Sequence, residues 1–447
     1  MSDSATRVER FGIEHIPEDQ RHGSPGRVFT LWFAANLTIA DYVIGVLCVL
    51  AFHMTVLQSL PVLAIGNVAG GLLLGLSAAM GPKLGFPQMF SSRAVFGRRG
   101  NYVLGAANWI STVGWFTVNT ILGAEAINAI DPGLGFLPAA ASLAALQVVI
   151  AIYGHDFIHL FEKVMSMVLG LLFLGVFFIC MMKLGEALAF LPAGAQQVPS
   201  LGSVGVVLAV SFSYIMSWSP YASDYSRYLP PSTSARRVTL FALVGGALAS
   251  FAIEVLGTMV GSITQSFDYF GSLKALAGGF GIPAVIAIIL GAMAANALNI
   301  YTNSLSALVL DIRTKRWLTV VAGGLVGFAL AVVGGANFES FFENFLLTLD
   351  YWITPWLGMI LVDFFILRRT AVEDCLNARD WDVGALAIYT ASILVSVPFM
   401  VPPVQVPWPI GSFAGAFGGA DFSYYISFAV AGLSYFLYRR RRGRPIA

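Results

Sequence analysis

Stretches of about 20 mostly apolar residues recur between residues 30 and 438, and this repetition limits the fold more than any other feature. A helix of that length crosses the hydrocarbon core of a bilayer. A membrane β-barrel would instead show short segments of alternating polarity, which these runs lack. The composition agrees, with 57% hydrophobic and 11% charged residues and a mean hydropathy of +0.78. The pattern therefore predicts an all-α polytopic membrane protein.

We expect twelve transmembrane helices, each ending within a few residues of an apolar run. The first 28 residues carry both charge signs and lack the apolar core of a signal peptide, so no cleaved leader is expected. The predicted spans are residues 30–53, 56–80, 102–129, 135–153, 157–182, 201–223, 236–261, 280–308, 317–335, 343–367, 383–402 and 420–438.

The basic residues of the connections predict the orientation of these spans, because loops rich in Lys and Arg stay in the cytoplasm. One set of connections carries only Lys183 and Lys274. We therefore expect both termini to be cytoplasmic and the protein to lie in the plasma (inner) membrane, in contact with lipid. The opposite set, which includes both termini, carries Arg7, Arg10, Arg21, Arg27, Lys83, Arg93, Arg98, Arg99, Arg227, Arg236, Arg237, Arg313, Lys315, Arg316, Arg368, Arg369, Arg379 and the "RRRRGR" tail at 439–444.

Motifs of other protein classes are missing from the sequence. The three cysteines are scattered, without the spacing of a metal cluster or disulfide framework. The chain contains no HExxH motif, nucleophile elbow or Walker A motif, and it has no repeated filter element of a channel. A membrane-embedded enzyme or a channel is therefore disfavoured, and neither a cofactor nor a nucleic-acid partner is expected.

Polar side chains line one face of two predicted spans. Trp115 and Asn119 lie four residues apart in the third span, so they share a helical face. Asn296, Asn299 and Asn303 form a stripe on the eighth span. A single Asn in a membrane helix most often joins two helices, whereas three on one stripe favour a polar cavity.

Two spans contain features that interrupt a membrane helix. Asp41 lies in the middle of the first span, although a charged side chain at that depth costs about 2.5–3.5 kcal/mol on insertion scales. Pro220 follows Trp218 within a Ser-rich part of the sixth span, where it removes a backbone hydrogen bond. Broken helices at matching positions of two halves are typical of inverted-repeat transporters.

The chain also resembles the nucleobase:cation symporter-1 family, especially its purine–cytosine permease branch. The likeness runs over nearly the whole chain in the expected order. It is carried by "GIEHIPEDQRHG" and "LWFAANLTIADYVIG" at the start, "SRAVFGRRG" at 92–100, "GWF" at 114–116, "SPYASDYSRYLP" at 219–230 and "WLGMILVDFFILRR" at 356–369.

This resemblance implies a LeuT-type five-plus-five inverted repeat with broken helices 1 and 6, followed by two further helices. The corresponding division is a cytoplasmic segment 1–28, a first repeat 29–183, a second repeat 200–367, helices 11 and 12 within 368–438, and a basic tail 439–447.

The resemblance also implies how a substrate is held. Family members place a planar heterocycle between aromatic rings and bind its edges with amides. The matching residues are Trp115 and Trp218 for the rings, and Asn119 and Asn299 for the amides. Asn296 on the same stripe, together with Asp41, completes the predicted substrate-binding set.

A sodium site is implied less directly. Sodium-coupled members use backbone carbonyls of the first span, here Leu37 and Ala40, with two hydroxyl residues of the eighth, here Thr302 and Asn303. Asn303 departs from the pattern because it offers an amide oxygen. Asp41 could take a proton, strengthen a cation site, bind a basic substrate, or bond to freed backbone N–H groups. The hypothesis favours sodium over protons by a small margin.

The expected function is secondary active import of a nucleobase, of cytosine or purine type, by cation symport with alternating access. The alternative is import of another nitrogen heterocycle or a cationic vitamin-like compound. The expected partner is a small heterocyclic substrate, and a monomer is expected to suffice.

Overall fold

The computed structural model describes residue 9 and residues 11–312, 314–334, 338–401 and 410–441. The described residues form helices and turns, without a β-strand. The remaining parts of the N-terminal segment, of the 403–419 connection and of the basic tail lie outside the described residues.

Each predicted span overlaps one described helix or a pair of neighbouring helices, but the predicted count of twelve transmembrane helices is not confirmed. Eight described helices are long and apolar enough to cross a membrane, or nine when the bent pair α1 and α2 counts as one span. The main helices are α1 (Pro25–Ala35), α2 (Ile39–Leu50), α3 (Val56–Ala78), α7 (Asn101–Ile130), α8 (Phe136–Tyr153), α9 (His155–Met182), α11 (Leu201–Met216), α12 (Ala222–Ser226), α13 (Ala235–Thr264), α15 (Gly281–Val309), α16 (Arg316–Gly334), α17 (Phe338–Leu361), α19 (Val383–Ser396) and α20 (Ser423–Arg441).

Short elements connect these helices. The segment after α3 folds into α4 (Gly81–Leu84), α5 (Gln88–Ser91) and α6 (Arg93–Phe96). The remaining short helices are α10 (Leu184–Ala189), α14 (Tyr269–Leu276) and α18 (Val372–Leu376).

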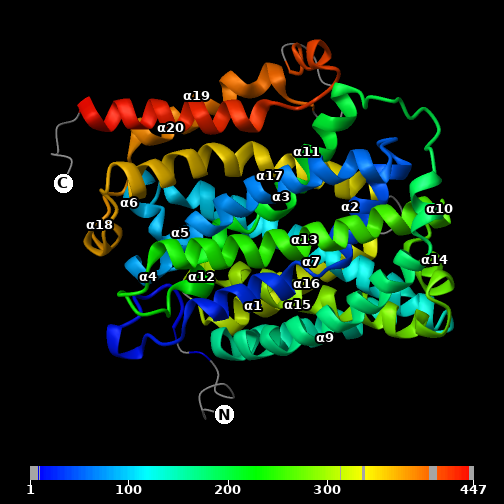
Figure 1. Cartoon of the computed structure of the whole chain (residues 1–447). Coiled ribbons are helices and arrows are strands. Elements are labelled where there is room, and N and C mark those ends of the chain that lie inside the picture. Colours follow the sequence, from blue (N-terminus) through cyan, green and yellow to red (C-terminus); the bar gives the residue numbers. More distant parts are fainter. Residues whose placement is uncertain (1–8, 10, 313, 335–337, 402–409, 442–447) are drawn as a thin grey trace.

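The spans pack in two groups, with a third set of helices along one edge (Figure 1). In the first group α13 packs against α1, α2 and α3, and α11 packs against α3. In the second group α7 packs against α8, α15 and α16. Helices α17, α19 and α20 form the outer set, and α9 runs along the opposite edge of the bundle.

Small residues allow the helices of the first group to approach closely, as is usual between membrane helices. Gly45 of α2 lies against the backbone of Glu254 and Gly257 in α13, and Gly257 in turn lies against the carbonyl of Tyr42. Gly70 of α3 meets Ile215 of α11 in the same way. A Cβ at these glycines would collide with backbone or side-chain atoms, so the contacts depend on glycine.

Candidate functional site

Two helices of the first group are broken, as predicted. Helices α1 and α2 meet at a bend of 53° across Asn36, Leu37 and Thr38. The α11 helix ends at Met216, and a short 3-10 turn over Ser219–Tyr221 precedes α12. Pro220 lies at the start of that turn, where the backbone N–H would have no helical acceptor, so its missing N–H costs no hydrogen bond.

A hydrogen bond joins the two breaks. The indole Nε1 of Trp218 donates to Oδ1 of Asn36 over 3.0 Å. Trp218 also packs edge-on against Trp32 and Tyr221, with ring centroids 5.5 and 5.4 Å apart. The side chain is 3% exposed, so Trp218 lies within the protein rather than at a membrane surface.

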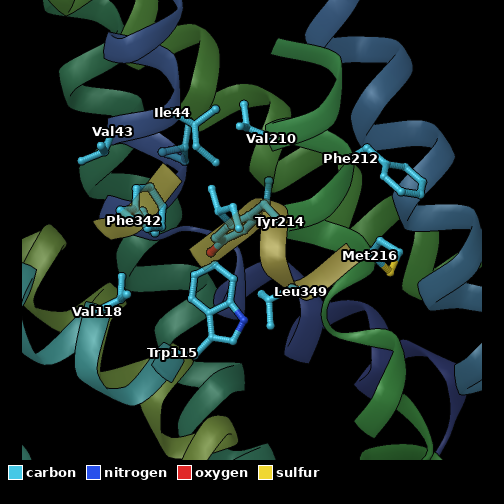
Figure 2. Packing of buried hydrophobic residues seen from close by; sticks show 14 of the residues in the cluster. Val43, Ile44, Trp115, Val118, Val210, Phe212, Tyr214, Met216, Phe342 and Leu349 are labelled. Atoms are coloured by element: carbon cyan, nitrogen blue, oxygen red, sulfur yellow. The ribbon is translucent and has the colours of Figure 1, made fainter. Parts of the chain in front are cut away.

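Trp115 lies in a second aromatic cluster (Figure 2). Its ring meets Tyr214 of α11 edge-on at a centroid distance of 5.3 Å, and Phe345 of α17 lies at the same distance. The indole Nε1 of Trp115 is buried and has no hydrogen-bond partner among the described residues. A buried N–H donor without an acceptor costs free energy. This N–H group is therefore a candidate to donate a hydrogen bond to a bound ligand.

Three of the predicted amides meet in one network between α7 and α15. Asn119 and Asn299 both donate to Oδ1 of Asn296, each over 3.2 Å. Asn296 itself donates to the carbonyl of Phe116 and to Oε1 of Gln147 in α8. The oxygen Oδ1 of Asn119 is buried and has no partner among the described residues. The network therefore leaves one free acceptor one turn from the free donor of Trp115.

Tyr221 extends this network to the broken sixth span. Its hydroxyl donates to Oδ1 of Asn299 over 3.1 Å, and its ring packs against Trp218. Asn299 is fully buried. The amides of the second helix group are thus connected to the broken helix of the first group.

Asp41 lies just after the break in the first span and is fully buried. The Thr38 hydroxyl lies 3.4 Å from Oδ2 of Asp41 and 2.7 Å from the hydroxyl of Tyr214. Because Tyr214 also packs against Trp115, one chain of contacts runs from the carboxylate to the aromatic cluster. The oxygen Oδ1 of Asp41 has no partner among the described residues.

The predicted aromatic pair is not in direct contact. Trp115 and Trp218 belong to different packed clusters, and no ring contact joins them among the described residues. Whether the two rings hold one planar ligand between them stays a prediction.

The structure does not bring the four predicted sodium ligands together. The carbonyl of Leu37 lies against Gly291 in α15, and Thr302 follows eleven residues later, about 16 Å along the helix. Thr302 donates to Oδ2 of Asp224 over 2.8 Å, and Asn303 donates to the carbonyl of Trp109. Residues 291–295, which read "GAMAA", offer no side-chain oxygen beside Leu37. Motif matching alone could not show that Thr302 and Asn303 lie at a different depth in the bundle from the carbonyl of Leu37.

The C-terminal part of the polar stripe on α15 forms hydrogen bonds to α7. Asn303 contacts the hydroxyl of Thr112, and Asn108 donates to the hydroxyl of Ser306, at 3.0 and 2.9 Å. The predicted stripe therefore divides into helix–helix contacts at Asn303 and the amide network at Asn296 and Asn299.

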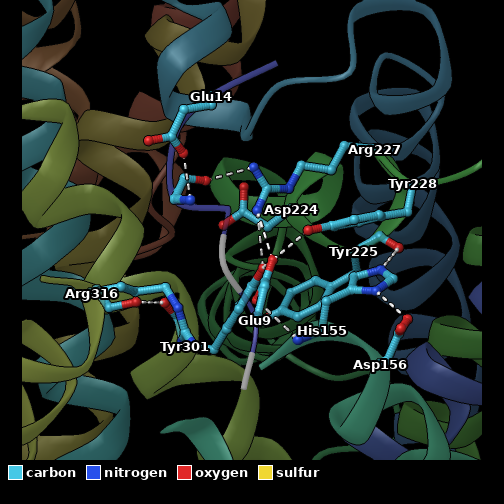
Figure 3. Close-up of polar contacts among 12 residues, drawn as sticks. Glu9, Glu14, His155, Asp156, Asp224, Tyr225, Arg227, Tyr228, Tyr301 and Arg316 are labelled. Atoms are coloured by element: carbon cyan, nitrogen blue, oxygen red, sulfur yellow. Dashed lines mark hydrogen bonds and ion pairs between the residues drawn. The ribbon is translucent and has the colours of Figure 1, made fainter. Parts of the chain in front are cut away.

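A buried polar cluster closes one end of the bundle (Figure 3). Arg227 forms an ion pair of 3.2 Å with Glu9 and donates to the carbonyl of Gly12 over 2.7 Å. The hydroxyls of Tyr228 and Tyr301 also donate to Glu9, over 2.6 and 3.0 Å. The N-terminal segment is thereby attached to α15 and to the residues just after α12 through largely buried charged groups.

Arg227 does not pair with Asp224, although the two residues lie only three positions apart in the sequence. The guanidinium of Arg227 turns to Glu9, while Asp224 accepts hydrogen bonds from the backbone N–H of Gln88 and from Thr302. A cavity of about 620 Å³ opens beside the cluster, and its lining includes Glu9 and Glu14 but no predicted site residue.

Sequence reasoning missed two residues of the site, Tyr214 and Tyr221. Tyr221 directly follows Pro220, and Tyr214 lies four residues before Trp218. Their contacts with Thr38 and Asn299 join residues far apart in the sequence, so spacing carried no signal for them.

Comparisons with known proteins agree with this architecture. A family model described as a permease for cytosine/purines, uracil, thiamine and allantoin matches residues 15–427. The chain is 29% identical to a protein of Bacillus subtilis named "Putative purine-cytosine permease YxlA", over 98% of this chain and 97% of that protein. It is 26% identical to the purine-cytosine permease fcyB of Emericella nidulans, over 97% of this chain and 88% of the relative.

A solved structure shares the fold. Mhp1, described as a nucleobase-cation-symport-1 family transporter in a closed conformation with bromovinylhydantoin bound, matches with a TM-score of 0.79 at 17% identity. The match covers 99% of this chain and 95% of that chain. This likeness confirms the predicted fold class, an all-helical membrane protein of LeuT type with broken helices 1 and 6. Because the family model spans most of the chain, the protein belongs to the permease family for cytosine/purines, uracil, thiamine and allantoin, and it is a multi-pass membrane transporter rather than an enzyme.

Proposed function

We propose that this transporter imports a nucleobase of cytosine or purine type across the plasma membrane, by proton symport with alternating access. The observation that carries the substrate proposal is the pair of free polar atoms on α7. Trp115 offers an N–H donor and Asn119 an amide oxygen, both buried and one turn apart. The names of the relatives add support for a purine or cytosine substrate.

The chemistry of a nucleobase fits these groups. Its edge alternates donors and acceptors, which a donor and an acceptor at neighbouring positions can satisfy together. Its two faces are apolar, and stacking of a base on an aromatic side chain contributes about 1–3 kcal/mol. The rings of Trp115 and Tyr214 supply such a surface beside the amides.

The arrangement of oxygens favours protons over sodium as the coupling ion, which reverses the preference drawn from the sequence. Sodium needs several oxygen ligands around one point, and Leu37 and Thr302 lie at different depths of the bundle. Asp41 is a buried carboxyl beside the break, in contact with Tyr214 through Thr38. A carboxyl in this position can bind and release a proton as the break opens to either side.

Thermal stabilisation of the purified protein tests the proposal. A ligand at 100 times its Kd stabilises the folded state by about 2.7 kcal/mol. We expect cytosine or a purine to raise Tm, with or without sodium. Stabilisation only by hydantoins or by cationic vitamin-like compounds would replace the substrate class, and stabilisation that requires sodium would remove proton coupling.

Three substitutions test the binding site. Trp115→Ala, Trp218→Ala and Asn299→Ala are each expected to weaken nucleobase binding by at least about tenfold, equivalent to 1.4 kcal/mol. The reason is loss of a stacking surface or of an amide that positions Asn296. Binding is measured by calorimetry on folded protein, with Trp381→Ala as the control because that ring is 50% exposed. Unchanged affinity in all three variants would move the binding site elsewhere.

Cysteine labelling tests the proposed orientation, with both termini in the cytoplasm. Cys48, Cys180 and Cys375 are buried, so an introduced exposed cysteine reacts above a low background. We expect Gly133→Cys, in an exposed connection, to react with an impermeant maleimide on intact cells. Ser232→Cys is the matched control in an exposed connection of the opposite set, and it should react only after permeabilisation. The reverse result would invert the topology.

A further inference from the structure

Glu254 of α13 is a second fully buried carboxyl, on the helix that packs against α2 just after Asp41. The close packing of α2 on α13 produces this proximity. Gly45 lies against the backbone of Glu254, and Tyr42 lies against Gly257 one turn further along. Ser250, one turn before Glu254, donates to Oδ1 of Asn36 at the break between α1 and α2.

Glu254 pairs with an amide rather than with a cation. Among the residues that the structure describes, no ion pair joins a basic side chain to Glu254 or to Asp41. The polar partner of Glu254 is the amide of Asn67 in α3, which donates to Oε2. The other titratable groups that face the two carboxyls are Cys48 and Tyr214, and neither is a cation at neutral pH.

Each carboxyl also has one oxygen without a partner. Oδ1 of Asp41 and Oε1 of Glu254 are buried, and no described group donates to either. Both side chains are fully buried, and the two helices that carry them pack closely against each other. Two negative charges buried this way, without a cation, would each carry a large desolvation penalty and would repel one another. A proton on one of the two carboxyls removes the repulsion and the desolvation penalty of that carboxyl.

We propose that Asp41 and Glu254 together form the coupling site for protons. Glu254 binds one proton, and the presence or absence of that proton changes how readily Asp41 binds or releases its own proton. This inference rests on the proposed proton symport and extends it by assigning the second group. A proton forms an O–H bond on one carboxyl oxygen and leaves from the same oxygen to water, so no further reactant is required. The contacts from Asp41 through Thr38 and Tyr214 to Trp115 then connect proton occupancy to the substrate cluster.

Infrared spectroscopy of the purified protein tests the pair without substrate. We expect a carbonyl band of a protonated carboxylic acid that shifts in D₂O and is absent in Glu254→Gln. Its titration midpoint should move by about one pH unit or more in Asp41→Asn, because strongly interacting groups titrate together. Glu162→Gln is the control, since Glu162 is a buried carboxyl on α9, and the band removed by that substitution should titrate unchanged in Asp41→Asn.

A transport assay tests whether Glu254 takes part in proton coupling. In proteoliposomes, Glu254→Gln should retain exchange of labelled nucleobase at equal concentrations but lose or shift the pH dependence of net uptake. Asn67→Ala keeps the carboxyl and removes its amide donor, so it should move the midpoint of the Glu254 band even if Glu254→Gln fails to fold.

Either of two results would overturn the inference. In the first, the titration midpoint of the Glu254 band is the same in Asp41→Asn as in the wild type. In the second, the Glu254 carboxyl stays ionised at every pH and its infrared band changes on addition of sodium. Failure of nucleobases to stabilise the protein would overturn the substrate proposal alone, because the infrared titration needs no substrate.

Discussion

Asp41→Asn is expected to abolish proton-driven accumulation of nucleobase. Exchange of labelled for unlabelled nucleobase across the membrane, at equal concentrations on both sides, should remain. Asparagine keeps the size of the side chain and can still accept from Thr38, but it cannot bind and release a proton. A gradient of one pH unit supplies about 1.4 kcal/mol per proton, enough for about tenfold accumulation. We expect that tenfold accumulation to disappear in proteoliposomes with an imposed pH gradient.

Asp363→Asn is the matched control for Asp41→Asn. Asp363 is also a buried carboxyl, but Thr370 and Tyr435 satisfy its oxygens, far from the broken helix. Its substitution should leave pH-driven accumulation in place. Near-normal accumulation by Asp41→Asn, at matched protein and across pH, would falsify the coupling role and leave Asp41 as a structural residue of the break.

Arg227→Ala is expected to cause the largest loss of stability, of about 3–5 kcal/mol, because it leaves the buried carboxylate of Glu9 without its partner. The Arg227 side chain is fully buried and that of Glu9 is 7% exposed, so water can replace the lost partner of Glu9 only in part. The loss is measured as a fall in Tm of the purified protein.

The control for Arg227→Ala is Arg98→Ala. Arg98 pairs with Asp311 at 2.8 Å, but its side chain is 52% exposed. Solvent screens such a pair, so Arg98→Ala should change Tm little. Equal effects of the two substitutions would show that burial does not distinguish the pairs.

The pH dependence of stability gives a second measure of the Glu9 cluster. Burial acts to raise the pKa of Glu9, but Arg227, Arg316 and His155 outweigh burial and hold the pKa below 4.5. Because the folded state lowers this pKa, the cluster stabilises the protein fully above pH 4.5 and loses its effect as the pH falls below that value. The difference in Tm between the wild type and Arg227→Ala should therefore shrink only in that acidic range.

The amino-acid sequence by itself determined the helical class, the positions of the spans and the two broken helices. These properties are local, since the length of an apolar run, a proline within it or a buried acid can be read without knowing the neighbours. The stripe of amides on α15 was also predictable, because helical periodicity places Asn296 and Asn299 on one face. Family motifs added the LeuT-type arrangement of these parts.

The tertiary structure alone decided which faces meet. Thr302 lies on the predicted helix but turns to Asp224, because the depth at which α15 packs against the first span depends on the whole bundle. Arg227 lies three residues from Asp224, yet its partner is Glu9 from the N-terminal segment. The backbone of Glu254 lies against Gly45, one turn after Asp41, only because two glycines let α2 and α13 approach closely. Each contact joins residues distant in the chain, and the choice between partners is set by packing that no local pattern encodes.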